Sequence, residues 1–211
     1  MPDPATPPTL GAILAGGLAR RLGGGDKALR TVGSRTVLAR LVDRVAPQVT
    51  RLILNANDDP RRFDDLAMPV VADGLPDHPG PLAGVLATLE WSAAFHPAIE
   101  WVVTVPGDAP FLPRDLVVRL HAGRQNGDTS FACAASQGRT HPVVGLWPVS
   151  VRDELRSAVA SDGIRKIDTF TRRYSCSVVE WPTTPVDPFF NVNTPEDLTE
   201  ATRLVTIQPE L

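Results

Sequence analysis

The first apolar run of the chain, Thr9–Ala15, ends at a segment that is too rich in glycine to be helical. Residues 16–27 contain five glycines and four charged residues, and a glycine inside a helix costs roughly 0.5–1 kcal/mol relative to alanine. A short continuous apolar run that stops at glycines is typical of a buried parallel strand followed by a loop. The sequence therefore predicts a fold that opens with a buried strand and an irregular, cation-bearing loop.

Strands and helices are predicted to alternate through the first half of the chain. Apolar periodicity and chain breakers indicate helices from Thr36 to Pro47 and over 82–89, and strands at 51–54, 70–71 and 101–105. This alternation is typical of a mostly parallel sheet that is covered by helices on both faces. We therefore expect an α/β fold.

The second half of the chain continues with elements of both kinds. We expect a helix over 114–122, strands near 130–135 and 142–147 around the turn 136–139, helices near 151–160 and 164–172, a strand near 176–181 and a helix that starts at Thr194. Residues 1–8 are rich in proline and are expected to form a disordered leader. Residues 9–211 are expected to form a single domain, since domains typically have roughly 100–200 residues.

The composition excludes several classes of protein. With 21 Lys and Arg against 24 Asp and Glu, the formal charge is −3, which argues against electrostatic binding of duplex nucleic acid. Hydrophobic residues make up 43% of the chain, so it is not expected to be disordered. No apolar run approaches the ~18 residues of a membrane helix, and the first residues lack the pattern of a signal peptide. We expect a cytoplasmic protein with no membrane or nucleic-acid partner.

Cysteine and histidine form no metal-binding motif in this sequence. Cys133 and Cys176 are far apart and do not form a C-x-x-C pair, so neither a disulfide framework nor a zinc site is indicated. His78 and His141 each precede a proline and have no His-x-Glu or cysteine partner, so they are interpreted as loop histidines that bind solvent or a carbonyl. The absence of a G-x-S-x-G motif leaves a hydrolase triad without support.

Polar or glycine-rich loops follow several of the predicted strands. Gly16-Gly17, Asn55, Asp73 and Asp108 each come soon after the end of one strand. In parallel sheets, ligands bind beyond the carboxyl ends of the strands. If the predicted strands are parallel, these residues converge on one edge of the sheet and form a ligand site there.

The loop after the first strand has the chemistry of a polyphosphate site. Glycines allow backbone N–H groups to point inward around an anion, and Arg20, Arg21 and Lys27 add positive charge. The loop lacks the Gly-Lys-Ser/Thr of a Walker A motif and the spacing of a G-x-G-x-x-G fingerprint. A surface loop with solvated basic residues is the alternative interpretation.

Asp108 lies between two prolines, Pro106 and Pro110, directly after the strongest predicted strand. A carboxylate at a strand end can hold Mg²⁺ while the phosphates of a substrate supply further ligands. It can equally cap the turn that follows. Asn55 and Asp73 carry the same two interpretations, as ligand-binding residues or as turn formers.

Taken in order, these segments resemble the molybdenum cofactor guanylyltransferase family. The resemblance rests on the loop 14–27, Asn55-Ala-Asn57, Asp73, Gly80-Pro-Leu-Ala-Gly84, Pro106-Gly-Asp-Ala-Pro110, His141-Pro142 and Asn191-Val-Asn-Thr-Pro-Glu-Asp197. The glycine-rich loop that ends in Asp-Lys is shared widely by nucleotidyltransferases. The Gly-Pro-Leu-Ala-Gly and Asn-Val-Asn-Thr-Pro segments narrow the choice to this family.

The resemblance implies a nucleotide-diphospho-sugar-transferase-like fold, which is a Rossmann-like, three-layer α/β/α sandwich with a mostly parallel sheet. It also implies an enzyme that transfers GMP from GTP to the terminal phosphate of molybdenum-molybdopterin and releases pyrophosphate, with Mg²⁺ as cofactor. GTP and molybdenum-molybdopterin would be the substrates. A monomer is expected, with transient contacts to molybdopterin-loading proteins or molybdoenzymes.

Carried over by position, the resemblance assigns roles to residues of this chain. The nucleotide-binding residues would be Leu14, Ala15, Gly16, Gly17, Arg21, Lys27, Asn55, Asp73 and Asp108. Arg21, Lys27 and Asp108 would be catalytic, and Asp108 would also bind the metal. The polar segments left over are our candidates for the molybdopterin side: the loop from His78 through Pro81 to Gly84, and Arg139, His141, Asn191 and Asn193.

Three other functions are alternatives to this one. A cytidylyltransferase that acts on the same cofactor usually has Ala-Gly where this chain has Gly16-Gly17. A sugar-phosphate nucleotidyltransferase is a further alternative among enzymes. A non-catalytic nucleotide-binding regulator on the same fold should have lost Lys27 or Asp108, and this sequence keeps both.

Overall fold

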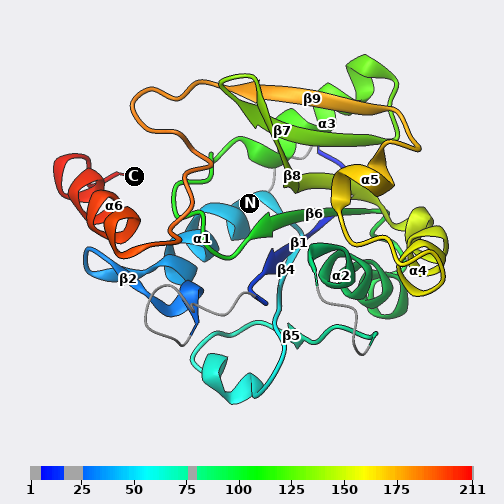
Figure 1. Ribbon diagram of the computed structural model, residues 1–211, viewed down its shortest axis with the longest axis horizontal. Helices are drawn as coiled ribbons and strands as arrows, with labels where there is room; N and C mark the ends of the chain where they lie inside the picture. Colours follow the sequence, from blue (N-terminus) through cyan, green and yellow to red (C-terminus); the bar gives the residue numbers. More distant parts are fainter. Residues whose placement is uncertain (1–5, 17–25, 76–79, 211) are drawn as a thin grey trace.

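A seven-stranded sheet forms the centre of the molecule (Figure 1). The computed structural model describes residues 6–16, 26–75 and 80–210. Along the sheet, the strands follow the order β5-β4-β1-β6-β8-β7-β9. Their bounds are Thr9–Leu14 (β1), Arg51–Asn55 (β4), Val70–Val71 (β5), Trp101–Pro106 (β6), Phe131–Ser136 (β7), Arg139–Pro148 (β8) and Cys176–Trp181 (β9).

Most of the neighbouring strands are parallel. β1 pairs in parallel with β4 and with β6, and β5 is parallel to β4. β8 runs antiparallel to both β6 and β7, and β9 is parallel to β7. The mostly parallel sheet predicted from the sequence is confirmed. It divides into a parallel half (β5, β4, β1 and β6) and a mixed half (β8, β7 and β9).

Helices cover both faces of the sheet, which gives the expected three layers. One face carries α1 (Val37–Val45), α3 (Leu116–Gly127) and α6 (Pro195–Ile207), and the other carries α2 (Pro81–Phe95), α4 (Arg152–Ala160) and α5 (Ile167–Thr171). Each face has its own cluster of buried apolar side chains, one around Leu41 and Ile13 and the other around Leu86 and Trp147. Both faces of the sheet are therefore excluded from water, as in other parallel sheets.

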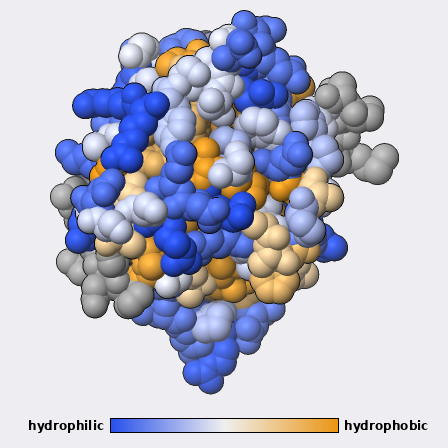
Figure 2. Space-filling view, turned by 90° about the vertical axis from the view of Figure 1, so that its right-hand side faces the viewer, coloured by the Kyte–Doolittle hydropathy of each residue, from blue (hydrophilic) through white to orange (hydrophobic). Residues whose placement is uncertain are grey.

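The side of the molecule that carries α4 and α5 is mostly polar at its surface. Figure 2 looks onto this side, where hydrophilic side chains cover most of the area and hydrophobic ones show in patches between them. α2 packs against α4, and its Leu82, Val85 and Leu89 are buried. The sequence pattern that predicted a helix at these positions is confirmed, and the helix continues to Phe95.

Two helices begin at threonines whose side chains cap them. The Thr36 hydroxyl accepts a hydrogen bond from Ala39 N at 3.1 Å at the start of α1. Thr194 forms a capping box with Asp197 at the start of α6, which satisfies two backbone donors that a helix end otherwise leaves unpaired. The predicted start of the last helix at Thr194 is confirmed.

A short hairpin of β2 (Thr31–Val32) and β3 (Arg35–Thr36) was not predicted. Two residues per strand are too few to show the alternation by which strands are recognised. Gly33, with φ +63, occupies its turn. The backbone there adopts a left-handed conformation that favours glycine.

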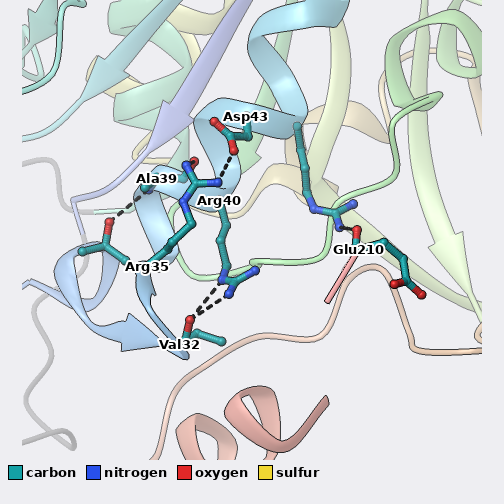
Figure 3. A network of polar contacts seen from close by, with 8 residues as sticks. Val32, Arg35, Ala39, Arg40, Asp43 and Glu210 are labelled. Carbon is teal, nitrogen blue, oxygen red and sulfur yellow. Dashed lines mark hydrogen bonds and ion pairs between the residues drawn. The ribbon is translucent and has the colours of Figure 1, made fainter. Parts of the chain in front are cut away.

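An arginine network fastens this hairpin and the segment at Glu210 to α1 (Figure 3). Arg40 donates from Nε and Nη2 to the carbonyl oxygen of Val32, at 3.1 and 2.9 Å. Arg44 donates to the carbonyl oxygens of Leu112 at 2.8 Å and Glu210 at 3.3 Å. Burial, reinforced by nearby arginines, lowers the pKa of Arg44 to about 10. The network therefore ties the β2–β3 hairpin, the Leu112 segment and the segment at Glu210 to α1.

Two further helices, α3 and α5, differ in length from their predictions. α3 runs on to Gly127, because Gly123 lies against β9 and a Cβ atom there would be 2.4 Å from Val179 Cγ2. Gly123 is therefore needed for packing against β9 and does not end the helix. The helix ends at Asp128, whose φ is +45. α5 has only five residues of the expected 164–172. No helix in the described part of the chain is long and apolar enough to cross a membrane.

Candidate active site

The carboxyl ends of β1, β4 and β6 are tied together at one edge of the sheet. Ala15 N–H donates to Asn55 O at 2.8 Å, and Gly107 N–H donates to Leu14 O at 2.9 Å. A Cβ atom at Gly107 would lie 3.0 Å from the Cα of Ala15, so glycine permits the close approach of the two segments. The structure thus brings Leu14 and Ala15, with Gly16 next to them, to the predicted edge.

Asp73 is held at this edge by two asparagine side chains. Asn55 Nδ2 donates to Asp73 Oδ1 at 2.9 Å, and Asn57 Nδ2 donates to Asp73 Oδ2 at 2.9 Å. Asp73 N–H donates back to Asn57 Oδ1 at 2.9 Å. Both carboxylate oxygens are therefore fixed in direction and keep lone pairs for a ligand. Asn57 is a member of this cluster that the sequence analysis gave no role.

The Gly80–Gly84 segment packs against the same cluster. A Cβ atom at Gly84 would lie 2.4 Å from Asn55 Oδ1, so only glycine allows α2 to begin so close to the strand ends. Gly80 has φ +132 and precedes Pro81, which is exposed in the first turn of α2. Gly84 thus shapes the floor of the site through packing, next to the nucleotide candidates.

Lys27 and Asp108 face each other across a small cavity. Lys27 Nζ lies 3.7 Å from Asp108 Oδ2, and both side chains are about one-fifth exposed, at 23% and 20%. The cavity has a volume of about 70 Å³ and is lined by Leu14, Ala15, Lys27, Ala28, Pro106, Gly107 and Asp108. A cation from the loop after β1 and a carboxylate from the end of β6 therefore share one cavity.

The Asn191–Asn193 segment also reaches this cavity. Val192 N–H donates to the carbonyl oxygen of Asp108 at 2.8 Å. Lys27 Nζ donates to Asn193 Oδ1 at 2.6 Å. Asn193, a sequence candidate for the molybdopterin side, therefore touches the cation on the nucleotide side of the site.

Burial raises the pKa of Asp108, and the positive charge of Lys27 opposes part of that rise. A cation bound at this carboxylate would stabilise its ionised form in the same way that Lys27 does. Within the described residues, no group of three or more His, Cys, Asp or Glu side chains could hold a metal ion. The donor set fits Mg²⁺ in the manner typical of phosphate-dependent enzymes, in which one or two carboxylates act together with substrate phosphates and water.

Arg62 connects the phosphate side of the site to the Asp73 cluster. Its Nη1 lies 2.5 Å from Asp26 Oδ2, and its Nη2 donates to the carbonyl oxygen of Asn57 at 2.5 Å. The Asp26 side chain is only 8% exposed. Asp26 immediately precedes Lys27 in the sequence. The pair joins residues 36 positions apart in a 3₁₀ turn and a loop, and no sequence signal marks it.

A second cavity lies on the mixed half of the sheet and shares Pro106 with the first. Its volume is about 170 Å³. Its lining includes Arg139, His141, Phe189 and Asn191. Three of the sequence candidates for the second substrate are therefore together in one cavity, which we name the acceptor cavity. Phe189 is an addition that sequence reasoning missed.

His141 is held by a hydrogen-bonded chain that was not predicted. Ser136 Oγ lies 2.8 Å from His141 Nε2 and donates to Asp187 Oδ2 at 3.1 Å. Burial lowers the pKa of His141, and the positive charge of Arg139 lowers it further. The negative charges of Asp187 and Glu180 act in the opposite direction. The interpretation of His141 as a loop histidine that binds solvent or a carbonyl is wrong, because it lies in β8 and its half-buried ring is bonded to the hydroxyl of Ser136.

Several sequence candidates lie outside the described residues. These are Gly17, Arg20, Arg21 and His78. The structure therefore brings together Lys27 and Asp108, Asn55 and Asp73, and Arg139, His141 and Asn191, and their roles in binding or catalysis follow as proposals below.

Comparison with known proteins identifies the family. A family model described as the MobA-like NTP transferase domain matches residues 11–175. The chain is 55% identical over 201 residues to the molybdenum cofactor guanylyltransferase of Nitrobacter hamburgensis, with 95% of this chain and 96% of that protein covered. It belongs to the molybdenum cofactor guanylyltransferase family. The chain is therefore a nucleotidyltransferase, and the resemblance seen in the sequence motifs is confirmed.

A second relative and two solved structures agree with this assignment. The molybdenum cofactor guanylyltransferase of Rhodopseudomonas palustris is 55% identical over 210 residues, with 100% of this chain and 97% of that protein covered. Molybdopterin-guanine dinucleotide biosynthesis protein A from Archaeoglobus fulgidus has a TM-score of 0.72 at 23% identity, covering 94% of this chain and 100% of that one. A Mycobacterium tuberculosis protein in complex with manganese has a TM-score of 0.68 at 18% identity, covering 93% and 98%. These two structures bear on the fold alone, and the nucleotide-diphospho-sugar-transferase-like fold predicted from the sequence is confirmed.

Proposed function

We propose that this chain transfers GMP from GTP to the terminal phosphate of molybdenum-molybdopterin, forming the guanine dinucleotide cofactor and releasing pyrophosphate. The observation that carries the proposal is the shared cavity of Lys27 and Asp108 at the ends of β1 and β6, next to the acceptor cavity. A reaction between two phosphate-bearing substrates needs two adjoining sites of this kind. The printed name of the relatives, molybdenum cofactor guanylyltransferase, supports guanylyl transfer to this cofactor.

The Asp73 cluster is proposed to bind the base of the nucleotide. Guanine presents neighbouring N–H donors on one edge, and a carboxylate can accept from both. Cytosine presents an acceptor nitrogen on the corresponding edge, which the negative charge of Asp73 would repel. Because Asn55 and Asn57 fix both carboxylate oxygens, the cluster is set to favour guanine without reorganising. Asp73 is therefore our candidate for base selection.

Lys27 and Asp108 are proposed to act on the triphosphate. Lys27 Nζ donates to Asn193 Oδ1 and lies close to Asp108, so its ammonium group is held at the cavity. Leu14 and Ala15 also line the cavity. A positive charge fixed at this place stabilises the charge that builds on the departing pyrophosphate.

Asp108 is proposed to hold a divalent cation together with the phosphates of GTP. When bound, Mg²⁺ supplies positive charge to the phosphate oxygens. The manganese complex of the Mycobacterium tuberculosis protein is in keeping with a divalent cation on this fold. The chain's own part is to keep one ionised carboxylate, Asp108, directed at the cavity beside Lys27.

The acceptor cavity is proposed to bind molybdopterin through Arg139, His141 and Asn191. The reaction needs no protein nucleophile, because a phosphate oxygen of the second substrate attacks the α-phosphorus. What the protein must provide is alignment of the attacking oxygen with the departing pyrophosphate. Such positioning can contribute on the order of 7–11 kcal/mol to a reaction of two bound substrates.

The proposal is tested by supplying each of the four nucleoside triphosphates with Mg²⁺ and molybdenum-molybdopterin and measuring pyrophosphate and the dinucleotide product. We expect turnover with GTP alone. Release of pyrophosphate with CTP and not with GTP would assign the cytidylyltransferase activity instead. Absence of turnover with every nucleotide, in protein that binds GTP, would indicate the non-catalytic regulator.

A further inference from the structure

A chain of hydrogen bonds leads from Asp187 through Ser136 to the acceptor cavity. Asp187 Oδ1 accepts from Phe189 N–H at 2.9 Å, which fixes the orientation of the carboxylate. Asp187 Oδ2 accepts from Ser136 Oγ at 3.1 Å, and Ser136 Oγ is in turn 2.8 Å from His141 Nε2. Ser136 is 2% exposed, so these bonds are shielded from exchange with water.

The direction of this chain determines where the proton on His141 lies. An ionised carboxylate only accepts hydrogen bonds, so the single proton of the Ser136 hydroxyl points to Asp187. Ser136 Oγ then offers only lone pairs to the ring, and His141 Nε2 must carry the hydrogen of the 2.8 Å bond. In the neutral ring, Nδ1 is consequently an acceptor.

His141 Nδ1 is available to a ligand. It makes no hydrogen bond to any residue that the structure describes, and it is not fully buried. The ring lines the acceptor cavity and packs against Phe189, with ring centroids 4.7 Å apart. The ring is therefore fixed on one edge by Ser136 and on its face by Phe189, while Nδ1 remains open.

We propose that Asp187 and Ser136 are positioning residues that hold His141 in the Nε2–H form, so that Nδ1 accepts a hydrogen bond from the second substrate. The inference rests on the proposed function, since it names a contact of the acceptor in that reaction. The substrate group must be a hydrogen-bond donor. An N–H group of the pterin heterocycle and the P–OH group of a monoprotonated phosphate both have this chemistry.

The surroundings of His141 favour the neutral ring that this contact requires. Burial lowers its pKa and Arg139 acts in the same direction, whereas Asp187 and Glu180 oppose them. Ser136 lies between Asp187 and the imidazole, so the carboxylate directs the ring mainly through the hydroxyl proton. The hydrogen bonds from Asp187 through Ser136 thus fix the ring and its proton without adding a charge at Nδ1.

Two replacements of His141 separate its two nitrogen atoms. In His141→Asn the side-chain amide lies near the position of Nδ1, and in His141→Gln it lies near that of Nε2. At pH 5.5 we expect His141→Gln and Ser136→Ala each to raise the KM for molybdenum-molybdopterin about tenfold, the loss of one hydrogen bond worth about 1.4 kcal/mol. His141→Asn should recover much of this loss. The KM for GTP should stay within about twofold in all three variants, and the exposed Ser150→Ala should match the wild type.

The tautomer is measured separately, by ¹⁵N NMR of the full chain with labelled histidine, where His141→Gln identifies the signals. We expect an unprotonated Nδ1 and a protonated Nε2 in the wild type, and a mixture of tautomers in Ser136→Ala. A protonated Nδ1 in the wild type overturns the inference, as does a molybdopterin KM in His141→Gln that is unchanged at every pH from 5.5 to 8. A wild type that turns over no nucleotide defeats the proposed function, and the NMR result then decides the inference by itself.

The source of the donor is resolved by pH. The second pKa of a phosphate monoester is about 6, so a contact to P–OH weakens as the pH rises through that value. A contact to a heterocycle N–H does not change there. We measure the molybdopterin KM of His141→Gln relative to wild type from pH 5.5 to pH 8. This ratio falls toward one if the donor is P–OH, and it stays near ten if the donor is a heterocycle N–H. A ratio of one throughout this range contradicts the proposal.

Discussion

The parallel and mixed halves of the sheet build their parts of the cleft by different means. In the parallel half, the nucleotide candidates lie directly at strand ends, and the bonds of Asp73 join residues only 16 to 18 positions apart. In the mixed half, His141 is fixed through Ser136 to Asp187, which is 51 positions from Ser136. The first kind of site follows from the topology of a parallel sheet. The second exists only because a distant segment folds back over the hairpin of β7 and β8.

The largest expected effect is on turnover, in Lys27→Ala. Lys27 is the basic residue that the structure places in the cavity shared with Asp108. Loss of one fixed charge or donor of this kind typically lowers kcat by about 10²–10³. Steady-state pyrophosphate release measures the loss, and denaturant unfolding should show little change in stability. Lys166→Ala removes a lysine that is exposed at the start of α5 and serves as the control. Unchanged turnover in Lys27→Ala would remove Lys27 from the mechanism.

The next largest effect separates the two halves directly, in Asp73→Asn. Loss of the carboxylate that we propose to read guanine should raise the KM for GTP about tenfold, the equivalent of about 1.4 kcal/mol for one hydrogen bond to a charged group. The KM for molybdenum-molybdopterin should not change, because Asp73 belongs to the parallel half. Discrimination of GTP against CTP should fall as well. Competition kinetics with both nucleotides provide the measurement, and the exposed Asp64→Asn is the matched control.

A smaller effect is expected in Arg62→Met, which breaks the link between Asp26 and Asn57. The pair is partly shielded, with 29% of the arginine side chain exposed, so its loss should cost about 1 kcal/mol of stability and raise the KM for GTP a few-fold. Chemical unfolding and GTP titration measure the two effects. Arg61→Met is the control, because the neighbouring Arg61 is 80% exposed and, among the described residues, forms its ion pair with Asp59. Equal effects of both variants would show that Arg62 plays no part in the site.

The smallest effect is a gain of stability in Asp108→Asn. Burial raises the pKa of Asp108 above its ordinary value of 3.8, so the ionised carboxylate destabilises the fold. This cost is complete above the folded-state pKa and disappears as the pH falls to the unfolded value. The variant should therefore unfold at a higher temperature than the wild type at pH 8, and the difference should shrink toward pH 4. Thermal unfolding at both values, without nucleotide or metal, measures it. A variant less stable than the wild type at pH 8 would mean that the ion pair with Lys27 outweighs burial.

The sequence predicts the parallel half more completely than the mixed half. Gly107 and Gly84 mark places where chain segments approach closely, and the strand ends place Asn55, Asp73 and Asp108 without any knowledge of long-range contacts. Ser136 and Asp187 gave no signal, because a serine at a strand end and an aspartate in a loop have many ordinary roles. Their geometry depends on how residues 182–194 pass over the sheet, which no local pattern determines. The hairpin β2–β3 escaped prediction because its strands are too short to show a period.

The central claim is that Lys27 and Asp108 hold the triphosphate of GTP with a divalent cation in one cavity. Anomalous diffraction from crystals grown with GTP and Mn²⁺ tests it directly. We expect an anomalous peak at the Asp108 carboxylate, with the triphosphate in contact with Lys27. A metal ion bound away from Asp108, or a triphosphate that does not reach Lys27, would contradict it.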